Sequence, residues 1–107
     1  MAGPSPQGRA TKLLESHGYL VDVVERISRR GNMTWRNDLF GGFDLMAVDE
    51  QGKVLVVQVT SRSNVSARVI KVNGLPIVER FRKAGVIMQV WGWGKTKTKG
   101  DWQIVDI

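Results

Sequence analysis

The sequence predicts a mixed α/β fold in which a central sheet is flanked by helices. Apolar side chains recur at helical spacing over residues 10–17, and residues 54–59 form an almost continuous apolar run. A run that is apolar on both faces is typical of a central strand covered on both sides. With further apolar segments, the order reads helix, three strands, helix, two strands. The 107 residues suit one small domain over 1–107.

The first helix has clear start and stop signals. Ser5 can cap it, Pro6 suits its first position, and Gly18 suits the left-handed residue after its last turn. Residues 19–27 are rich in β-branched side chains and predict a strand. Residues 28–37 are polar and basic, so we expect a loop.

Two further strands are expected over 43–48 and 54–60. The intervening residues 49–53 have turn chemistry, which predicts an antiparallel hairpin. The rest of the chain predicts a helix that is capped by Ser63 or Asn64 and runs to about Val72, a short helix from Pro76 to Lys83, and strands over 86–93 and 101–107.

Composition excludes several kinds of site. The chain has no cysteine, so it has no disulfide, no thiolate zinc site and no catalytic thiol. Its one histidine, His17, excludes a multi-histidine metal site, and we expect it at the helix end. No apolar run approaches the roughly 20 residues that cross a bilayer, and the N-terminal segment lacks the apolar core of a secretory signal. We therefore expect a cytoplasmic protein without a membrane partner.

The positive charge is concentrated in the second half. Residues 1–53 carry seven Lys/Arg and seven Asp/Glu, whereas residues 54–107 carry nine and three. The whole net charge of +6 therefore lies after residue 53. Such asymmetry favours a polyanionic partner, most often nucleic acid. The alternative is a solvated basic surface.

Three polar residues are expected to meet beside the hairpin. Gln58 and Thr60 are two apart in the buried strand, so they point to one face. If the turn has five residues, Val48 pairs with Val54 and Asp44 lies across from Gln58 on that face. A four-residue turn would instead place Asp44 on the face of Val57.

Such a cluster suits a hard cation. Carboxylate, amide and carbonyl oxygens with water are the ligands that Mg²⁺ uses, and a bound cation can activate water and stabilise charge on phosphate. In the alternative interpretation, Asp44 stabilises a neighbouring turn and Gln58 is merely hydrogen-bonded.

These residues resemble the core of the PD-(D/E)XK nuclease superfamily, in which an Asp on one strand is followed by Glu-x-Lys on the next. Within it, the chain is most similar to small archaeal-type Holliday junction resolvases and to short phage nuclease-like proteins. The similarity extends over almost the whole chain. The matching segments are Gly-Arg-Ala-Thr-Lys-Leu-Leu-Glu-Ser-His-Gly-Tyr (8–19), Asp-Leu-Phe-Gly-Gly-Phe-Asp-Leu (38–45), Gln-Val-Thr (58–60), Trp-Gly-Trp (91–93) and residues 102–107.

The resemblance implies a restriction-endonuclease-like αβββαββ core and a metal-dependent endonuclease that hydrolyses phosphodiester bonds in DNA, with branched or Holliday-junction DNA as one substrate. It implies Mg²⁺ or Mn²⁺ as cofactor and a homodimer, in the host cytoplasm if the chain is phage-encoded. The motif departs from the family pattern, because Gln58 replaces Glu and Thr60 replaces Lys. Gln7 stands where resolvases carry an acid early in the first helix, and Glu15 is not its equivalent.

The resemblance also implies a role for each residue of the expected site. Asp44 would bind the metal with the amide oxygen of Gln58 and the carbonyl of Val59, and Thr60 would position the attacking water. Asp38 could add a carboxylate, and Lys71 or Arg68 could supply the missing cation from the second helix, where they share one face with Asn64. Gln58 and Thr60 equally favour a catalytically silent nucleic-acid-binding protein that retains the nuclease fold. A protein-interaction module is a third possibility.

The expected nucleic-acid surface is basic. It consists of Arg29, Arg30, Arg36, Arg62, Arg68, Lys71, Lys95, Lys97 and Lys99. Trp35 could stack on an unpaired base or anchor its loop on the core. We expect Trp91 and Trp93, which share one strand face, in the core or at a dimer surface rather than as platforms for bases.

Overall fold

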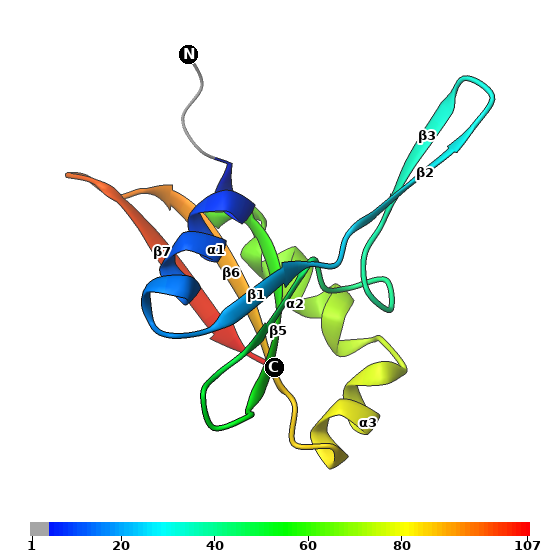
Figure 1. Cartoon of the computed structure of the whole chain (residues 1–107). Helices are drawn as coiled ribbons and strands as arrows, with labels where there is room; N and C mark the ends of the chain where they lie inside the picture. The colour runs from blue at the N-terminus through cyan, green and yellow to red at the C-terminus, as the bar shows by residue number, and fades with distance from the viewer. Residues whose placement is uncertain (1–4) are drawn as a thin grey trace.

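The computed structural model describes residues 5–107, apart from the side chains of Arg26, Ser28, Trp35 and Arg36. Three α-helices, one 3₁₀ turn and seven strands follow one another along this part of the chain (Figure 1). In chain order they are α1 (Pro6–Ser16), β1 (Leu20–Val23), β2 (Arg26–Arg30), β3 (Met33–Asn37), β4 (Leu45–Val48), β5 (Val54–Ser61), η1 (Arg62–Asn64), α2 (Val65–Asn73), α3 (Ile77–Lys83), β6 (Ile87–Lys95) and β7 (Gly100–Asp106).

Five strands form one mixed sheet in the order β1-β4-β5-β6-β7. The β5–β6 pair is parallel and the other three pairs are antiparallel. The predicted mixed sheet with flanking helices is confirmed, and β5 is the central strand that its apolar sequence predicted. Because β5 and β6 are parallel, the chain must cross over between them, and α2 and α3 make that crossover.

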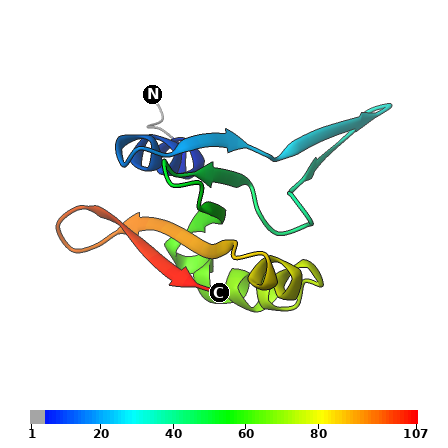
Figure 2. The ribbon, with the colours of Figure 1, turned by 60° about the horizontal axis from the view of Figure 1, so that its bottom comes forward.

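The helices cover opposite faces of the sheet (Figure 2). Ala10 and Leu14 of α1 pack on one face against Leu55 and Val57. Side chains of α2 and α3 pack on the other face against Val56 and its neighbours. Within residues 5–107 no helix combines the length and the apolar character that spanning a membrane requires.

The first helix is bounded as predicted. The Ser5 hydroxyl oxygen accepts a hydrogen bond from the Gly8 N–H at 3.1 Å, and Pro6 occupies the first helical position. The helix ends with His17 as its C-cap and with Gly18 at a φ of 88°. Glycine adopts that left-handed conformation without the steric cost that a Cβ would add.

The prediction of one strand over 19–27 and a loop over 28–37 is wrong. β1 ends at Val23, which pairs with Leu45 at the first residue of β4. One further backbone hydrogen bond, from the Val24 N–H to the Asp44 carbonyl, closes the pairing of these two segments. The chain instead forms a separate hairpin of β2 and β3, which projects from the body of the molecule (Figures 1 and 2). Its two-residue turn is Gly31-Asn32, with Gly31 at a φ of 59°. A Gly-Asn pair is a known hairpin signal that the polar composition obscured.

The β4–β5 hairpin has the predicted register. Val48 pairs with Val54 across the five-residue turn 49–53. The Asp49 carboxylate oxygen Oδ1 accepts hydrogen bonds from the N–H groups of Gln51 and Lys53 at 2.9 and 2.8 Å. This side chain replaces backbone partners inside the turn and thereby fixes its length.

The second helix begins as predicted, with Asn64 at its N-cap, although the Asn64 side chain makes no capping hydrogen bond. Residues 62–64 form the 3₁₀ turn η1, and α2 starts at Val65. The predicted interruption near Gly74 and the short helix up to Lys83 are both confirmed. Gly92 of β6 lets η1 approach closely, because a Cβ there would lie 2.9 Å from the Arg62 Cα.

Candidate functional site

Asp44 lies directly before β4, not inside a strand as predicted. Its backbone still bridges the two neighbouring strands, because its N–H donates to the Val57 carbonyl and its carbonyl accepts from the Val24 N–H. The preceding turn, in which Phe40 has a φ of 52°, bends the chain at this point. The carboxylate Oδ1 therefore accepts a hydrogen bond from the Val59 N–H at 2.8 Å.

Gln7, in the first turn of α1, provides the hydrogen bond to the second oxygen of the Asp44 carboxylate. Its Nε2 donates to Oδ2 of Asp44 at 3.1 Å and lies 3.4 Å from Oε2 of Glu25. The side-chain amide of Gln7 therefore lies between the carboxylates of Asp44 and Glu25. Gln7 is the residue that the resemblance placed at the acidic position of the first helix, and the structure brings it to Asp44.

The pKa of Asp44 is raised to about 6, mainly because burial removes the carboxylate from water. The hydrogen bonds from Val59 and Gln7 act in the opposite direction, since they favour the ionised form. The negative charge of Asp38 raises the pKa further. A buried carboxyl group with neighbouring acidic charge is a place where a cation would be stabilised.

Gln58 and Thr60 are buried beside Asp44, as predicted. Gln58 is only 4% exposed, and its Nε2 lies 3.4 Å from the carbonyl of Val59. Its Oε1 is buried and has no hydrogen-bond partner among the described residues. An unpartnered buried amide oxygen costs free energy, on the order of 1–3 kcal/mol. It is therefore a donor atom that a ligand could satisfy.

One cavity of about 600 Å³ joins these groups. We call it the site cavity. Its lining comes from the start of α1, the segment between β1 and β2, β2 itself, the turn before β4, the end of β5, and α2. It consists of Ser5, Pro6, Gln7, Glu25, Ile27, Asp38, Asp44, Gln58, Val59, Thr60, Ser61 and Arg68. The structure thus brings Asp38 and Arg68 to Asp44. Lys71, one turn further along α2, is exposed and lies outside this lining.

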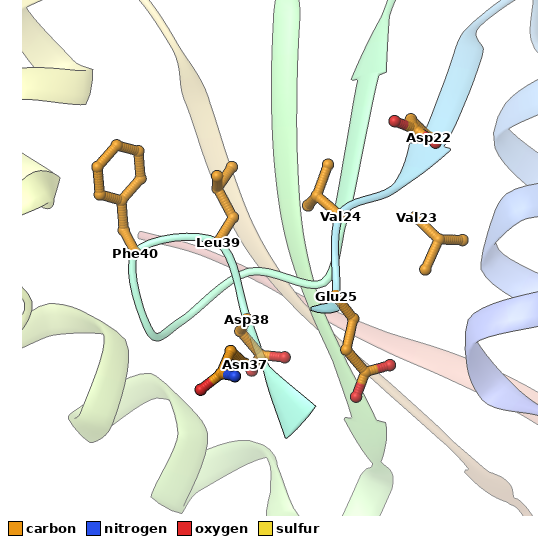
Figure 3. A pocket seen from close by; sticks show the side chains of 8 residues that line it. All are labelled: Asp22, Val23, Val24, Glu25, Asn37, Asp38, Leu39 and Phe40. Atoms are coloured by element: carbon orange, nitrogen blue, oxygen red, sulfur yellow. The ribbon is translucent and has the colours of Figure 1, made fainter. Parts of the chain in front are cut away.

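A second cavity of about 530 Å³ adjoins the first and shares Glu25 and Asp38 with it. Figure 3 shows that these two side chains point toward the same part of that cavity, whereas Asp22 lies apart. Glu25 was not predicted as a site residue because it fell within the expected strand over 19–27. The sequence signal that could have identified Glu25 was its position directly after the two apolar residues Val23 and Val24.

The donor set fits a hard divalent cation. Asp44 offers a carboxylate, Gln58 an unpartnered amide oxygen, and Val59 a backbone carbonyl, all oxygen ligands of the kind that Mg²⁺ takes together with water. No group of three or more His, Cys, Asp or Glu side chains with metal-binding geometry occurs in the described part of the chain. Water would therefore have to supply much of the coordination, as is common for Mg²⁺.

The predicted basic residues lie on both sides of the site cavity. Arg29 and Arg30 are exposed on the β2–β3 hairpin, and Lys95, Lys97 and Lys99 are exposed around the β6–β7 turn. The two hairpins diverge from each other, with the start of α1 between them (Figure 1). The side chains of Trp35 and Arg36 lie outside the described residues. Trp91 is buried in the core, as expected.

Comparison of the chain with protein-family models, curated proteins and solved structures gave no match. The function is therefore inferred from the chemistry of the site.

Proposed function

We propose that the chain is a metal-dependent endonuclease that hydrolyses phosphodiester bonds in DNA, with branched DNA such as a Holliday junction among its substrates. One observation carries the proposal. The buried carboxylate of Asp44 and the unpartnered Oε1 of Gln58 line the same cavity, which also contains the cation of Arg68. A carboxylate, a neutral oxygen donor and a cation are what a metal-assisted attack on phosphate requires.

Each residue has a distinct part in this proposal. Asp44, Gln58 and the Val59 carbonyl would hold the metal, which when bound would supply an activated water and stabilise negative charge on the phosphate. Thr60 orients that water with its hydroxyl group. Arg68 stabilises the charge on the phosphate oxygens in place of the family's lysine, and Asp38 adds negative charge that favours the cation. Hydrolysis adds water across one P–O bond and yields a phosphomonoester and an alcohol.

The fold supports the same proposal. If the projecting β2–β3 hairpin is set aside and α2 and α3 are counted together as one helical crossover, the remaining order agrees with the αβββαββ order that the resemblance implies. Asp44 precedes the second strand of that order, and Gln58 and Thr60 lie on the third. We propose that this is a restriction-endonuclease-like core in which the hairpin is an insertion.

A second candidate is a catalytically silent nucleic-acid-binding protein. The observation in its favour is that both oxygens of Asp44 already accept hydrogen bonds, from Val59 and from Gln7. A carboxylate that is satisfied in this way can serve a structural role. The exposed arginines and lysines would then bind phosphates without any cleavage.

Cleavage of labelled four-way-junction, duplex and single-stranded DNA in Mg²⁺ or Mn²⁺ distinguishes the two candidates. The wild type is compared with Asp44→Asn, with Gln58→Glu and with an EDTA control. We expect metal-dependent cleavage that is lost in Asp44→Asn. Gln58→Glu adds a carboxylate charge at a proposed ligand position and should strengthen metal binding, since opposite charges attract more strongly in a partly buried site than in water.

Metal binding is also measured without activity, as the rise in melting temperature on addition of Mg²⁺. The rise should be largest in Gln58→Glu and absent in Asp44→Asn. Salt-sensitive DNA binding with neither cleavage nor a metal-dependent shift in any variant would contradict the nuclease proposal and favour the silent protein. Cleavage that survives in Asp44→Asn would show that the metal site lies elsewhere.

A further inference from the structure

Two adjoining cavities lead away from the site cavity along the end of β6. The first, about 480 Å³, shares Ser61 with the site cavity. The second, about 530 Å³, shares Trp93 with the first. Ser61 and Trp93 are direct partners in the parallel β5–β6 ladder, so neighbouring cavities meet at a shared lining residue near the ends of these two strands, and we refer to this series of cavities as the track. We call the first the arginine cavity (Ser61, Arg62, Ser63, Trp93, Gly94, Lys95) and the second the tryptophan cavity (Arg9, Lys12, Leu13, Trp93, Trp102).

The tryptophan cavity is walled by aromatic rings and a guanidinium. The rings of Trp93 and Trp102 meet edge to face, with centroids 5.0 Å apart. The guanidinium carbon of Arg9 lies 4.5 Å from the centroid of the Trp93 ring, in cation–π geometry. Both tryptophans are only partly buried. Aromatic rings and arginine planes of this kind are the surfaces on which unpaired bases stack.

The cations along this track have unmet hydrogen-bonding capacity. Nε of Arg9 and Nη1 of Arg62 are buried and have no acceptor among the described residues. Lys12 and Lys95 lie beside them with exposed side chains. No acidic side chain is among the residues that line either cavity. The track therefore has positive charge and buried donors without a counter-charge, which phosphate groups would supply.

We propose that the arginine and tryptophan cavities bind an unpaired stretch of nucleic acid that leads away from the site cavity. Arg62 and Lys95 contact its backbone phosphates, and a base enters the tryptophan cavity against the rings of Trp93 and Trp102, beside the guanidinium of Arg9. The identity of the ligand as nucleic acid rests on the proposed function, but binding does not require cleavage. A base within a duplex has both faces covered by its neighbours, so this site selects unpaired nucleotides, such as those at a branch point or a frayed end.

Binding is measured by fluorescence anisotropy with labelled oligothymidylate of about twelve nucleotides, and with a duplex of equal length, in EDTA so that no DNA is cut. We expect Trp93→Leu to weaken oligothymidylate binding about 5- to 100-fold, the effect of losing one base–aromatic stack, and to leave duplex binding within about twofold. Trp93→Phe, which keeps an aromatic ring, should retain most of the wild-type affinity for oligothymidylate. Oligothymidylate should quench the tryptophan fluorescence of the wild type more than that of Trp93→Leu.

Lys12→Gln provides a second test that remains valid if the tryptophan variants misfold, because Lys12 is exposed and its replacement does not disturb the core. It should weaken oligothymidylate binding about two- to fivefold, whereas Lys83→Gln, the same change on α3, should not. Equal binding by wild type, Trp93→Leu and Lys12→Gln would overturn the inference. So would a wild-type dimer that dissociates in Trp93→Leu, because the surface would then be covered by a second copy.

The inference and the proposed hydrolysis can fail separately. Binding that depends on Trp93 in a protein that never cuts DNA would support the site and contradict the nuclease. Cleavage with binding that is insensitive to Trp93 would leave the nuclease in place and overturn the site. A protein that binds neither oligothymidylate nor the duplex would overturn both the binding site and the proposed nuclease.

Discussion

Gln7 donates a hydrogen bond from Nε2 to Oδ2 of Asp44 across 3.1 Å, and it thereby ties the first turn of α1 to the residue that precedes β4. Without this contact, one oxygen of a nearly buried carboxylate would depend on water. The amide favours the ionised form of Asp44 and lowers its pKa against the larger effect of burial. Gln7 is therefore a positioning residue for the proposed metal ligand.

Replacing Gln7 should weaken both the fold and the site. Gln7→Ala removes a hydrogen bond to a charged acceptor, which costs about 1.5–3 kcal/mol of unfolding free energy at neutral pH. It should also raise the pKa of Asp44 and reduce the stabilisation by Mg²⁺. Urea unfolding with and without Mg²⁺ measures both effects. Gln103→Ala, at an exposed position of β7, is the matched control and should change neither.

The raised pKa of Asp44 predicts how stability depends on pH. The raised pKa means that the folded protein holds the Asp44 proton up to about pH 6, whereas the unfolded chain releases it near the ordinary aspartate pKa of 3.8. The contribution of Asp44 to the free energy of unfolding is therefore fully present below the pKa of the unfolded chain, and it is lost as the pH rises through the folded-state pKa of about 6. Two pKa units correspond to about 3 kcal/mol.

Asp44→Asn isolates this contribution. At pH 8 the variant should be more stable than the wild type by up to about 3 kcal/mol, and at pH 4 the two should be similar. Urea unfolding at pH 4, 6 and 8 gives the difference, in which the effects of other titrating groups cancel. A difference that does not change with pH would show that Asp44 titrates normally.

The β2–β3 hairpin should contribute to DNA binding through its exposed arginines. Arg29→Gln with Arg30→Gln removes two potential phosphate contacts, so the slope of log affinity against log salt concentration should fall by about 1.8 in magnitude on duplex DNA. Arg80→Gln with Lys83→Gln removes the same charge from α3 and is the control. If both pairs lower affinity and slope equally, only net charge matters and the hairpin has no particular role.

Gly92 should be intolerant of a side chain. Gly92→Ala places a Cβ 2.9 Å from the Arg62 Cα and against Val65, so η1 or β6 must move. We expect a loss of about 1–3 kcal/mol and weaker binding in the arginine cavity. Gly74→Ala is the contrasting change, because its nearest neighbour would be 3.5 Å away and its φ of −84° suits alanine. Thermal unfolding should show it neutral or stabilised by up to about 1 kcal/mol.

The sequence by itself determined the elements whose signals are local. The Ser5 cap, the five-residue turn at 49–53 and the apolar run of β5 each depend on neighbours within a few residues, and each prediction was confirmed. The register that follows from that turn also predicted that Asp44, Gln58 and Thr60 come together. Periodicity of two along a strand made this inference possible, because it fixes which side chains share a face.

Only the tertiary structure decided what depends on distant partners. β1 stops at Val23 because the facing strand begins at Leu45, and no local pattern encodes where a partner begins. Likewise Gln7 reaches Asp44 from α1 and also contacts Glu25. Arg68 rather than Lys71 faces the cavity because the start of α2 lies beside the end of β5. Such choices arise from three-dimensional packing among elements far apart in sequence, whereas sequence periodicity reports only which face each element buries.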